Sequence, residues 1–140
     1  MQAKDAYWTT QVEIQRQGAE AWMLWAQGQK AEALKAMAAA AALEDTTEKS
    51  AVTPGPLAPE LLGDMLLEAN QPAQALKEYE TGLQKEPNRF RSVYGAGRAA
   101  ELAGNAQKAR TYYAQLVKIC ERGERQSRTE LARAVGYLAK

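Results

Sequence analysis

The sequence predicts an all-α fold, a solenoid of stacked helix pairs, and three observations support this prediction. Alanine is abundant in the 140-residue chain, whereas valine, isoleucine and phenylalanine are scarce. Alanine loses no side-chain entropy in a helix, and β-branched residues favour strands. A pattern of small and aromatic residues recurs after 34 positions. Glycine and asparagine separate the helical runs, which is typical of short turns between helices.

The repeat joins two segments, residues 59–88 and 89–123, which align when the chain is shifted by 34 residues. Each copy has a turn signal between two helical runs. The aligned pairs are Leu62 with Ala96, Gly63 with Gly97, Asn70 with Gly104, Ala75 with Ala109, and Tyr79 with Tyr113. We expect the glycines to let neighbouring helices approach closely, and the tyrosines to fill the space between one helix pair and the next.

A weaker third copy, residues 5–45, lies upstream and aligns after a shift of 42 residues, which places Ala21 on Gly63. The eight additional residues belong to an inter-repeat loop, residues 46–58, which is rich in proline, serine and threonine. We interpret this loop as a tolerated insertion, with a functional loop as the alternative.

The elements follow in order along a single domain, residues 1–140. Each repeat consists of a first helix, a turn and a second helix. The last helix is expected to cap the apolar face of the final repeat through Leu131, Val135 and Leu138. The predicted helices are 5–27, 30–44, 59–68, 72–86, 89–102, 106–123 and 127–139.

This spacing resembles the tetratricopeptide repeat, whose pattern is an apolar–glycine pair, a short turn, an alanine, an aromatic residue and a late proline. The residues that carry the resemblance are Leu62, Gly63, Ala75, Tyr79, Gly82 and Pro87 in the first strong copy, and Ala96, Gly97, Ala109, Tyr113 and Leu116 in the second, where Glu121 replaces the proline. The chain is also similar to uncharacterised bacterial proteins of this family. The resemblance covers about residues 14–123. It implies three helix pairs in a right-handed superhelix, with the first helix of each pair lining a concave groove.

Charge and composition exclude several classes of function. The 18 basic and 17 acidic residues leave a net charge of +1, which gives no long-range attraction to nucleic acid or to an anionic membrane. The chain has no histidine, and Cys120 is its one cysteine, so the commonest general base and metal ligand are missing. We therefore predict no enzyme activity, no cofactor and no metal site, and we interpret Cys120 as a buried structural thiol. Because the first residues lack a secretory signal, we expect the chain in the cytoplasm.

The resemblance also implies which side chains line the groove. Carried over residue by residue, these positions are Gln15, Gly18, Trp22 and Trp25 in the first copy; Leu57, Glu60, Asp64, Leu67 and Glu68 in the second; and Arg91, Tyr94, Arg98, Glu101 and Leu102 in the third. Arg91, Tyr94 and Arg98 share one helix face, and two guanidinium groups beside a phenol suit a carboxylate or phosphate. The alternative is that the arginines pair with the acidic residues of the same groove. The family's clamp for a C-terminal carboxylate needs lysine and asparagine at positions where Asp64 and Gly95 stand here, so we do not expect that type of site.

Aromatic residues gather in the first predicted helix. Trp8 and Trp22 are fourteen residues apart, so they lie on nearly the same helix face, with Val12 and Ala19 between them. We expect this stripe in the core. Trp25 points elsewhere and is a candidate groove anchor, because tryptophan is enriched at binding hot spots. If Trp8 or Trp25 is exposed, self-association through this long helix becomes the alternative.

The predicted function is a protein-interaction module that receives an extended peptide or a partner helix in its concave groove. The partner is a protein or peptide and can carry an anionic group. The candidate binding residues are Trp22, Trp25, Asp64, Arg91, Tyr94 and Arg98. Two alternatives stay open: a structural domain that forms a homo-oligomer through its aromatic-rich first helix, and an accessory tail of a larger protein.

Overall fold

Seven α-helices and no strands make up the part of the chain that the structure describes. The structure is a computed structural model, and it describes residues 2–47, 57–121 and 128–140. The helices are α1 (Gln2–Ala26), α2 (Lys30–Asp45), α3 (Ala58–Glu68), α4 (Pro72–Lys85), α5 (Phe90–Leu102), α6 (Ala106–Ile119) and α7 (Thr129–Leu138). The all-α prediction is confirmed, although α6 ends at Ile119 rather than at residue 123. Of the predicted loop 46–58, residues 48–56 lie outside the described ranges.

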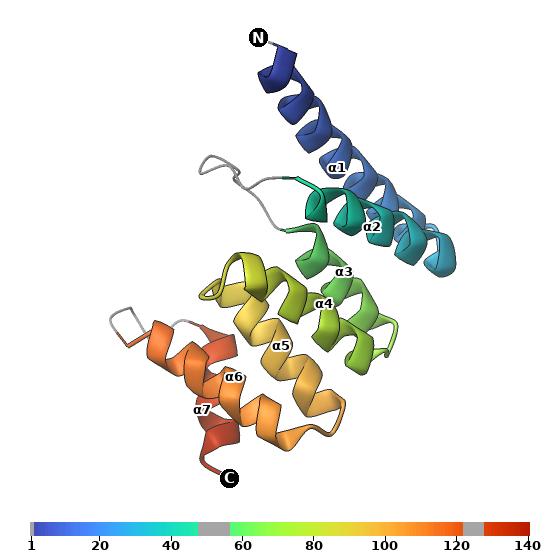
Figure 1. The fold of residues 1–140 in the computed structure, drawn as a ribbon. Helices are drawn as coiled ribbons and strands as arrows, with labels where there is room; N and C mark the ends of the chain where they lie inside the picture. The colour runs from blue at the N-terminus through green and yellow to red at the C-terminus, as the bar shows by residue number, and fades with distance from the viewer. Residues whose placement is uncertain (1, 48–56, 122–127) are drawn as a thin grey trace.

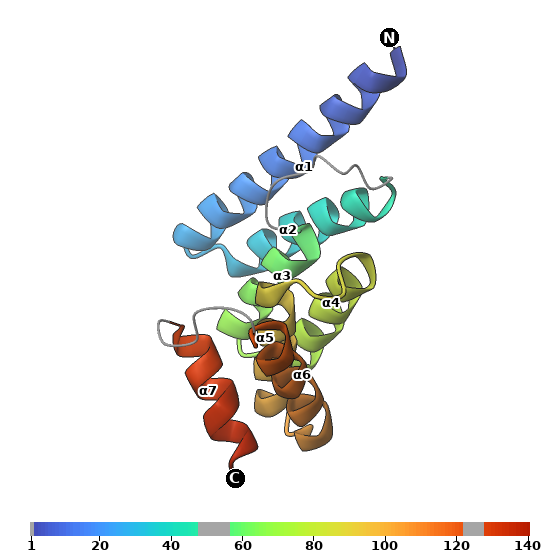
Figure 2. The same ribbon diagram turned by 90° about the vertical axis from the view of Figure 1, so that its left-hand side faces the viewer.

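The helices form consecutive pairs that stack in chain order (Figure 1). α1 packs on α2, α3 on α4 and α5 on α6, while contacts of α2 with α3 and of α4 with α5 join one pair to the next. The first helices of neighbouring pairs also touch, α1 with α3 and α3 with α5, and α7 lies against α6 at the end of the row (Figure 2). This arrangement is the predicted solenoid of helix pairs.

A short turn joins the two helices of each pair. Gly28, Asn70 and Gly104 have positive φ angles of 81°, 57° and 76°, a conformation that glycine and asparagine adopt at low cost. At the third turn, Oδ1 of Asn105 also accepts a hydrogen bond from the N–H of Lys108 at 3.1 Å, which caps the start of α6. The turn residues seen in the sequence therefore reverse the chain as predicted.

Two buried tyrosines pack between successive helices. Tyr79 on α4 is 1% exposed, and a Cβ added to Gly63 of α3 would lie 2.8 Å from its ring. A Cβ on Gly95 of α5 would come closer still to the same ring. Tyr113 on α6 has the same relation to Gly97, where the distance would be 2.8 Å. The glycines therefore leave room for tyrosine rings at the helix contacts.

One carboxylate is completely buried where α3 meets α5. The resemblance places Glu60 in the groove, but this side chain is 0% exposed. Its Oε2 accepts hydrogen bonds from Nε of Arg89 at 2.9 Å and from the hydroxyl of Ser92 at 2.5 Å. A buried carboxylate requires such partners, because removal from water penalises its charge. Glu60 is therefore part of the core and not of an open groove.

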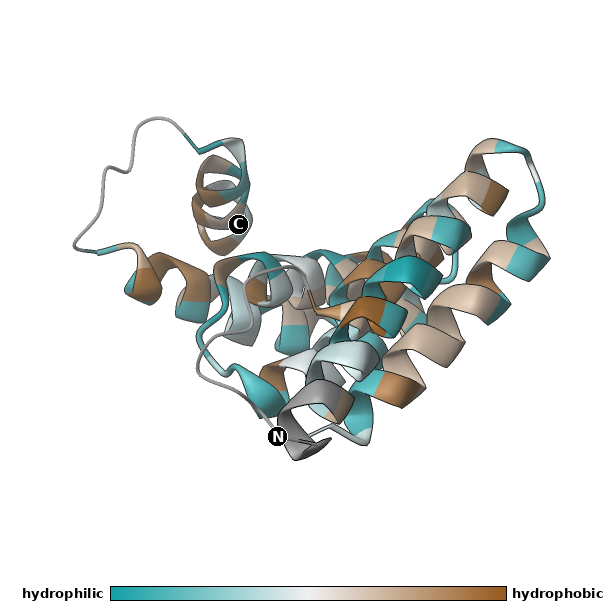
Figure 3. Cartoon of the chain, turned by 90° about the horizontal axis from the view of Figure 1, so that it is seen from above, coloured by the Kyte–Doolittle hydropathy of each residue, from teal (hydrophilic) through white to brown (hydrophobic). Residues whose placement is uncertain are grey.

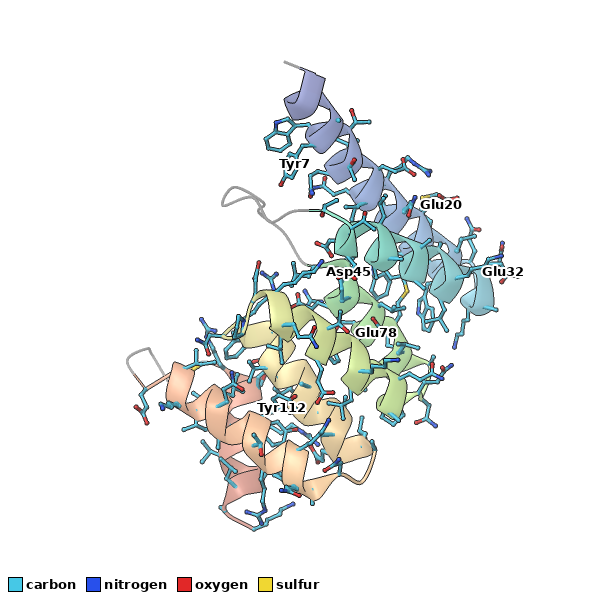
Figure 4. The ribbon with its side chains drawn as sticks, in the orientation of Figure 1. Tyr7, Glu20, Glu32, Asp45, Glu78 and Tyr112 are labelled. Atoms are coloured by element: carbon cyan, nitrogen blue, oxygen red, sulfur yellow. The ribbon has the colours of Figure 1, made fainter. Side chains whose placement is uncertain are left out.

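The ends of α2, α3 and α4 meet at a polar junction, near Asp45 in Figure 4. Oε2 of Glu44 accepts a hydrogen bond from the N–H of Ala58 at 2.6 Å, which satisfies a free donor at the start of α3. Nζ of Lys85 donates to the carbonyl oxygen of Glu44 at 3.0 Å and lies 3.2 Å from Asp45. Burial raises the pKa of Glu44, and the hydrogen bond from Ala58 and the charge of Lys85 offset this shift only in part.

The first helix is longer than its partner, and the part that carries Tyr7 projects beyond α2 (Figure 4). Trp8 is 51% exposed and Val12 63%, and Ala19 is exposed as well, so the predicted core stripe is wrong at these positions. At Val12 and Ala19 the reason is the helix face, because Gln11, Ile14 and Gly18 at the same level of α1 are buried. At Trp8 the greater length of α1 adds to this, since α1 has 25 residues and α2 only 16. Trp22 does pack against the core.

The last helix covers α5 and α6 with one face only. Leu131 is buried and Leu138 packs against the core, but Val135 is exposed, contrary to the prediction. Hydrophilic and hydrophobic residues alternate along the helices when the molecule is viewed from above (Figure 3). Val135 is 52% exposed. Cys120 is only partly buried, because it follows the last residue of α6 instead of lying within the helix.

Candidate partner-binding groove

The first ion-pair cluster of the groove joins α3 to α5. Nη2 of Arg91 lies 2.5 Å from Oδ2 of Asp64, and the hydroxyl of Tyr79 donates to Oδ1 of the same carboxylate at 2.5 Å. Nε of Arg91 is also 3.7 Å from Glu60. The guanidinium group of Arg91 is therefore paired inside the chain, as the alternative interpretation of this helix face expects.

A second cluster of the same type joins α5, α6 and α7. Glu101 accepts hydrogen bonds from the hydroxyl of Tyr113 at 2.7 Å and from Nη2 of Arg133 at 2.9 Å. Nη1 of Arg98 lies 3.3 Å from the same carboxylate. In both clusters a buried tyrosine and an arginine share one acidic residue. An anionic ligand would therefore compete with Asp64 or Glu101 for the arginines.

These contacts shift the pKa values of the groups involved. Burial and the adjacent Asp64 carboxylate raise the pKa of Tyr79, and burial and Glu101 raise that of Tyr113. Burial opposes ionisation of Glu101, but the hydrogen bonds from Tyr113 and Arg133 outweigh it and lower the pKa of this carboxyl. At neutral pH both tyrosines therefore act as protonated hydrogen-bond donors.

Three tyrosine rings form a row across α5, α6 and α7. The ring centroids of Tyr94 and Tyr113 are 6.5 Å apart, and those of Tyr113 and Tyr137 are 5.1 Å apart, which are favourable aromatic separations. Tyr94 and Tyr137 are partly buried, and neither hydroxyl forms a hydrogen bond within the described ranges. Two phenol groups at this end of the helix row are therefore without a hydrogen-bond partner among the described residues.

A second aromatic surface lies on α1. The rings of Trp22 and Trp25 pack edge to face with centroids 6.5 Å apart and an interplanar angle of 71°. Both are partly buried against the core. Nζ of Lys30 lies 5.2 Å from the centroid of the Trp25 ring, which is a cation–π distance. Trp22 and Trp25 are thus firmly placed, with part of each side chain left at the surface.

The predicted site residues fall into separate groups rather than one constellation. Arg91 meets Asp64, Arg98 belongs to the Glu101 cluster, and Tyr94 starts the tyrosine row. The two tryptophans form a group of their own at the other end of the stack, since α1 is separated from α5 by α3.

Sequence reasoning missed Arg133 and Tyr137, because α7 was interpreted as a cap alone. A signal was present: these two residues are four positions apart, so they share a helix face. What the spacing did not show is that this face meets Glu101 and Tyr113. Within the described ranges, no group of acidic or cysteine residues could hold a metal ion, and no helix is long and apolar enough to cross a membrane.

Part of the sequence is similar to a known family. The model of the family described as tetratricopeptide repeat matches residues 60–124. Over these residues the chain is similar to the tetratricopeptide repeat family. The matched tetratricopeptide span contains both tyrosine–carboxylate pairs, Tyr79 with Asp64 and Tyr113 with Glu101. No curated protein matches the sequence.

Two solved structures share the tetratricopeptide-like fold. PcrH from Pseudomonas aeruginosa is 18% identical, with a TM-score of 0.66, and the match covers 91% of this chain and 89% of that one. PcrH in complex with the chaperone binding region of PopB is 18% identical, with a TM-score of 0.68 and coverage of 90% and 94%. Because both matches span most of the chain, the shared fold extends beyond the residues that the family model matches.

Proposed function

We propose that this protein binds a partner polypeptide along the groove lined by α1, α3 and α5, and that it acts by binding rather than by catalysis. The observation that carries the proposal is that aromatic side chains stay partly exposed on first helices at both ends of the row. Trp22 and Trp25 lie on α1 and Tyr94 on α5. Tryptophan and tyrosine are enriched among the residues that dominate binding energy.

The charged residues between these aromatic groups are better suited to orient the partner than to strengthen its binding. An anionic group that took Arg91 from Asp64 would exchange one ion pair for another and leave a carboxylate without its cation. We therefore propose that aromatic contacts supply most of the affinity. Asp64, Arg91 and Arg98 would set the register of the partner through complementary charge.

The shared fold supports a polypeptide as the ligand. PcrH has been solved with the chaperone binding region of PopB, so a protein of this fold accommodates a segment of another protein. The relation between PcrH and this chain is an analogy of fold.

The proposal is tested by selecting phage-displayed random peptides on the full chain and titrating the selected peptides by calorimetry. Tyr94→Ala combined with Trp25→Ala should weaken binding at least about tenfold. Tyr112→Ala is the matched control, because Tyr112 lies on a second helix and donates its hydroxyl to Glu80 at 2.7 Å. Failure to select any peptide, or full affinity in the double variant, would show that the proposal is wrong. If the double variant Arg91→Ala with Arg98→Ala binds with full affinity, the two arginines are not binding residues, and the rest of the proposal stands.

A second candidate function, self-association through α1, is favoured by an exposed apolar stripe. Trp8, Val12 and Met23 are all exposed, and their spacing places them within a narrow sector of the helix. The α1 helix of a second copy could cover this sector. Sedimentation equilibrium should then show a dimer that Trp8→Ser with Val12→Ser dissociates, while Leu102→Ser, which alters an exposed leucine of α5, has no effect. A wild-type monomer at high concentration would exclude this function.

A further inference from the structure

Gly18 on α1 differs from the glycines that make room for tyrosine rings. A Cβ at Gly63 or Gly97 would meet a ring at 2.8 Å, whereas a Cβ at Gly18 would have no atom within 4 Å beyond its chain neighbours and the backbone of its own helix. Gly18 is nevertheless buried. Glycine inside a helix is less stable than alanine, and no neighbouring side chain requires it here. The chain therefore leaves a recessed space beside Gly18 unfilled.

One polar and three apolar residues share the helix face of Gly18. Ile14 and Gln11 lie about one and two turns before Gly18, and Trp22 and Trp25 lie about one and two turns after it, so all five residues share one helix face. Ile14 and Gln11 are buried, and the two tryptophans pack partly against the core. The space thus lies at a groove position, next to the aromatic surface on which the proposed function rests.

The charges near this surface limit what the space can hold. Nζ of Lys30 lies 5.2 Å from the centroid of the Trp25 ring, so its positive charge opposes a lysine or arginine of the partner. An acidic side chain would lose its hydration against Ile14 and the tryptophan rings. Aliphatic or aromatic groups meet neither difficulty, and they gain from removal of apolar surface from water.

We infer that the space beside Gly18 is a socket for one uncharged, apolar side chain of the partner polypeptide, which packs against Trp22 and Trp25. This inference rests on the proposed function and names the chemistry recognised at the α1 end of the groove. It assigns Gly18 the role of a binding residue through the side chain that it lacks.

The test fills the socket without disturbing the fold. Gly18→Leu and Gly18→Ala are titrated with peptides selected on the wild-type chain, and their melting temperatures are measured in parallel. Because no atom lies within 4 Å of the added Cβ, Gly18→Ala should melt at or above the wild-type temperature, and the melting temperature of Gly18→Leu shows whether that variant is folded. Gly18→Leu should weaken peptide binding at least about tenfold. Gly136→Leu on α7 is the matched control, since Gly136 is exposed and also has no atom within 4 Å of a Cβ; its affinity should be unchanged.

A double-mutant cycle identifies the peptide residue that enters the socket. Replacing one apolar residue of the peptide by alanine should weaken binding to the wild type but cause no further loss with Gly18→Leu. If Gly18→Leu does not fold, Gly18→Ala supplies the same comparison with a smaller side chain. Undiminished affinity in a folded Gly18 variant, or selected peptides without a required apolar residue, would overturn the inference while the proposed function stands. Failure to select any peptide would overturn the proposed function, and this inference with it.

Discussion

Replacing Gly95 by alanine should destabilise the fold, although the same change stabilises an ordinary helix. The added Cβ would clash with Cε1, Cζ and Cδ1 of Tyr79, the last at 2.8 Å. The ring has no room to retreat, because it is 1% exposed and also packs against Gly63. Its hydroxyl is held by Asp64 at 2.5 Å. Either α5 must move away from α4 or Tyr79 must leave its position.

The magnitude follows from two opposing effects. Overpacking of a well-filled core typically lowers the free energy of unfolding by about 1–3 kcal/mol, while alanine recovers about 1 kcal/mol of helix propensity. Because the added Cβ would meet three atoms of the buried Tyr79 ring, the upper part of the overpacking range, about 2–3 kcal/mol, applies. A net loss of roughly 1–2 kcal/mol is therefore expected for Gly95→Ala. For a chain of 140 residues, this loss corresponds to a fall in melting temperature of about 3–8 °C.

Calorimetry and urea unfolding followed by circular dichroism measure this loss, and two further variants isolate its cause. Gly136→Ala makes the same chemical change where a Cβ meets nothing within 4 Å, and it should raise stability by up to about 1 kcal/mol. In a Tyr79→Leu background, Gly95→Ala should no longer destabilise, because the ring atoms that it meets are gone. A Gly95→Ala variant as stable as the wild type would refute the reasoning.

Three further predictions concern buried and hydrogen-bonded charges. Arg89→Met should lower the free energy of unfolding by about 3–5 kcal/mol, because it leaves the carboxylate of Glu60 fully buried without its closest cation. Glu60→Gln should lower the free energy of unfolding by less in the same urea titration, since Arg89 keeps its ion pair with Glu86 at 3.0 Å. The pKa of Glu44 is raised in the fold, so its favourable contribution to the free energy of unfolding is present below about pH 4.3 and is lost as the pH rises through the folded pKa. Relative to the wild type, Glu44→Gln should therefore gain stability between pH 4 and pH 7, and a constant stability difference would contradict this. The pKa of Glu101 is lowered, so its favourable contribution to the free energy of unfolding is present above about pH 4.3 and is lost as the pH falls through the folded pKa. The stability difference between wild type and Glu101→Gln should shrink on acidification, and an unchanged difference at pH 3 would contradict this.

The spacing of small and aromatic residues was sufficient to predict the helix pairs and the packing of the tyrosines. Gly63 and Tyr79 belong to one repeat, so their contact is a local property of a helix–turn–helix unit. The exposure of Trp8 was not predictable in this way, because helical periodicity shows which face a residue lies on but not whether another helix covers it. That depends on which face of α1 packs against its neighbours in the fold, and Trp8 lies outside that face.

The ion-pair partners of the groove arginines could not be predicted from residue spacing either. Arg91 and Asp64 are 27 residues apart, and Arg133 and Glu101 are 32 apart, so each pair depends on how far one helix pair is displaced from the next. The residue types on each helix face are the same whether the arginines are free or paired. For that reason the sequence left anion binding and internal pairing open, and the distances select internal pairing for the isolated chain.

The amino-acid sequence alone determined that this protein is a stack of helix pairs, because alanine content, turn glycines and the tyrosine–glycine repeat act over one repeat or less. The tertiary structure decided which charges are neutralised, which aromatic side chains remain at the surface, and where a glycine leaves space unfilled. Those properties depend on distances between helices from different repeats, which no single repeat encodes.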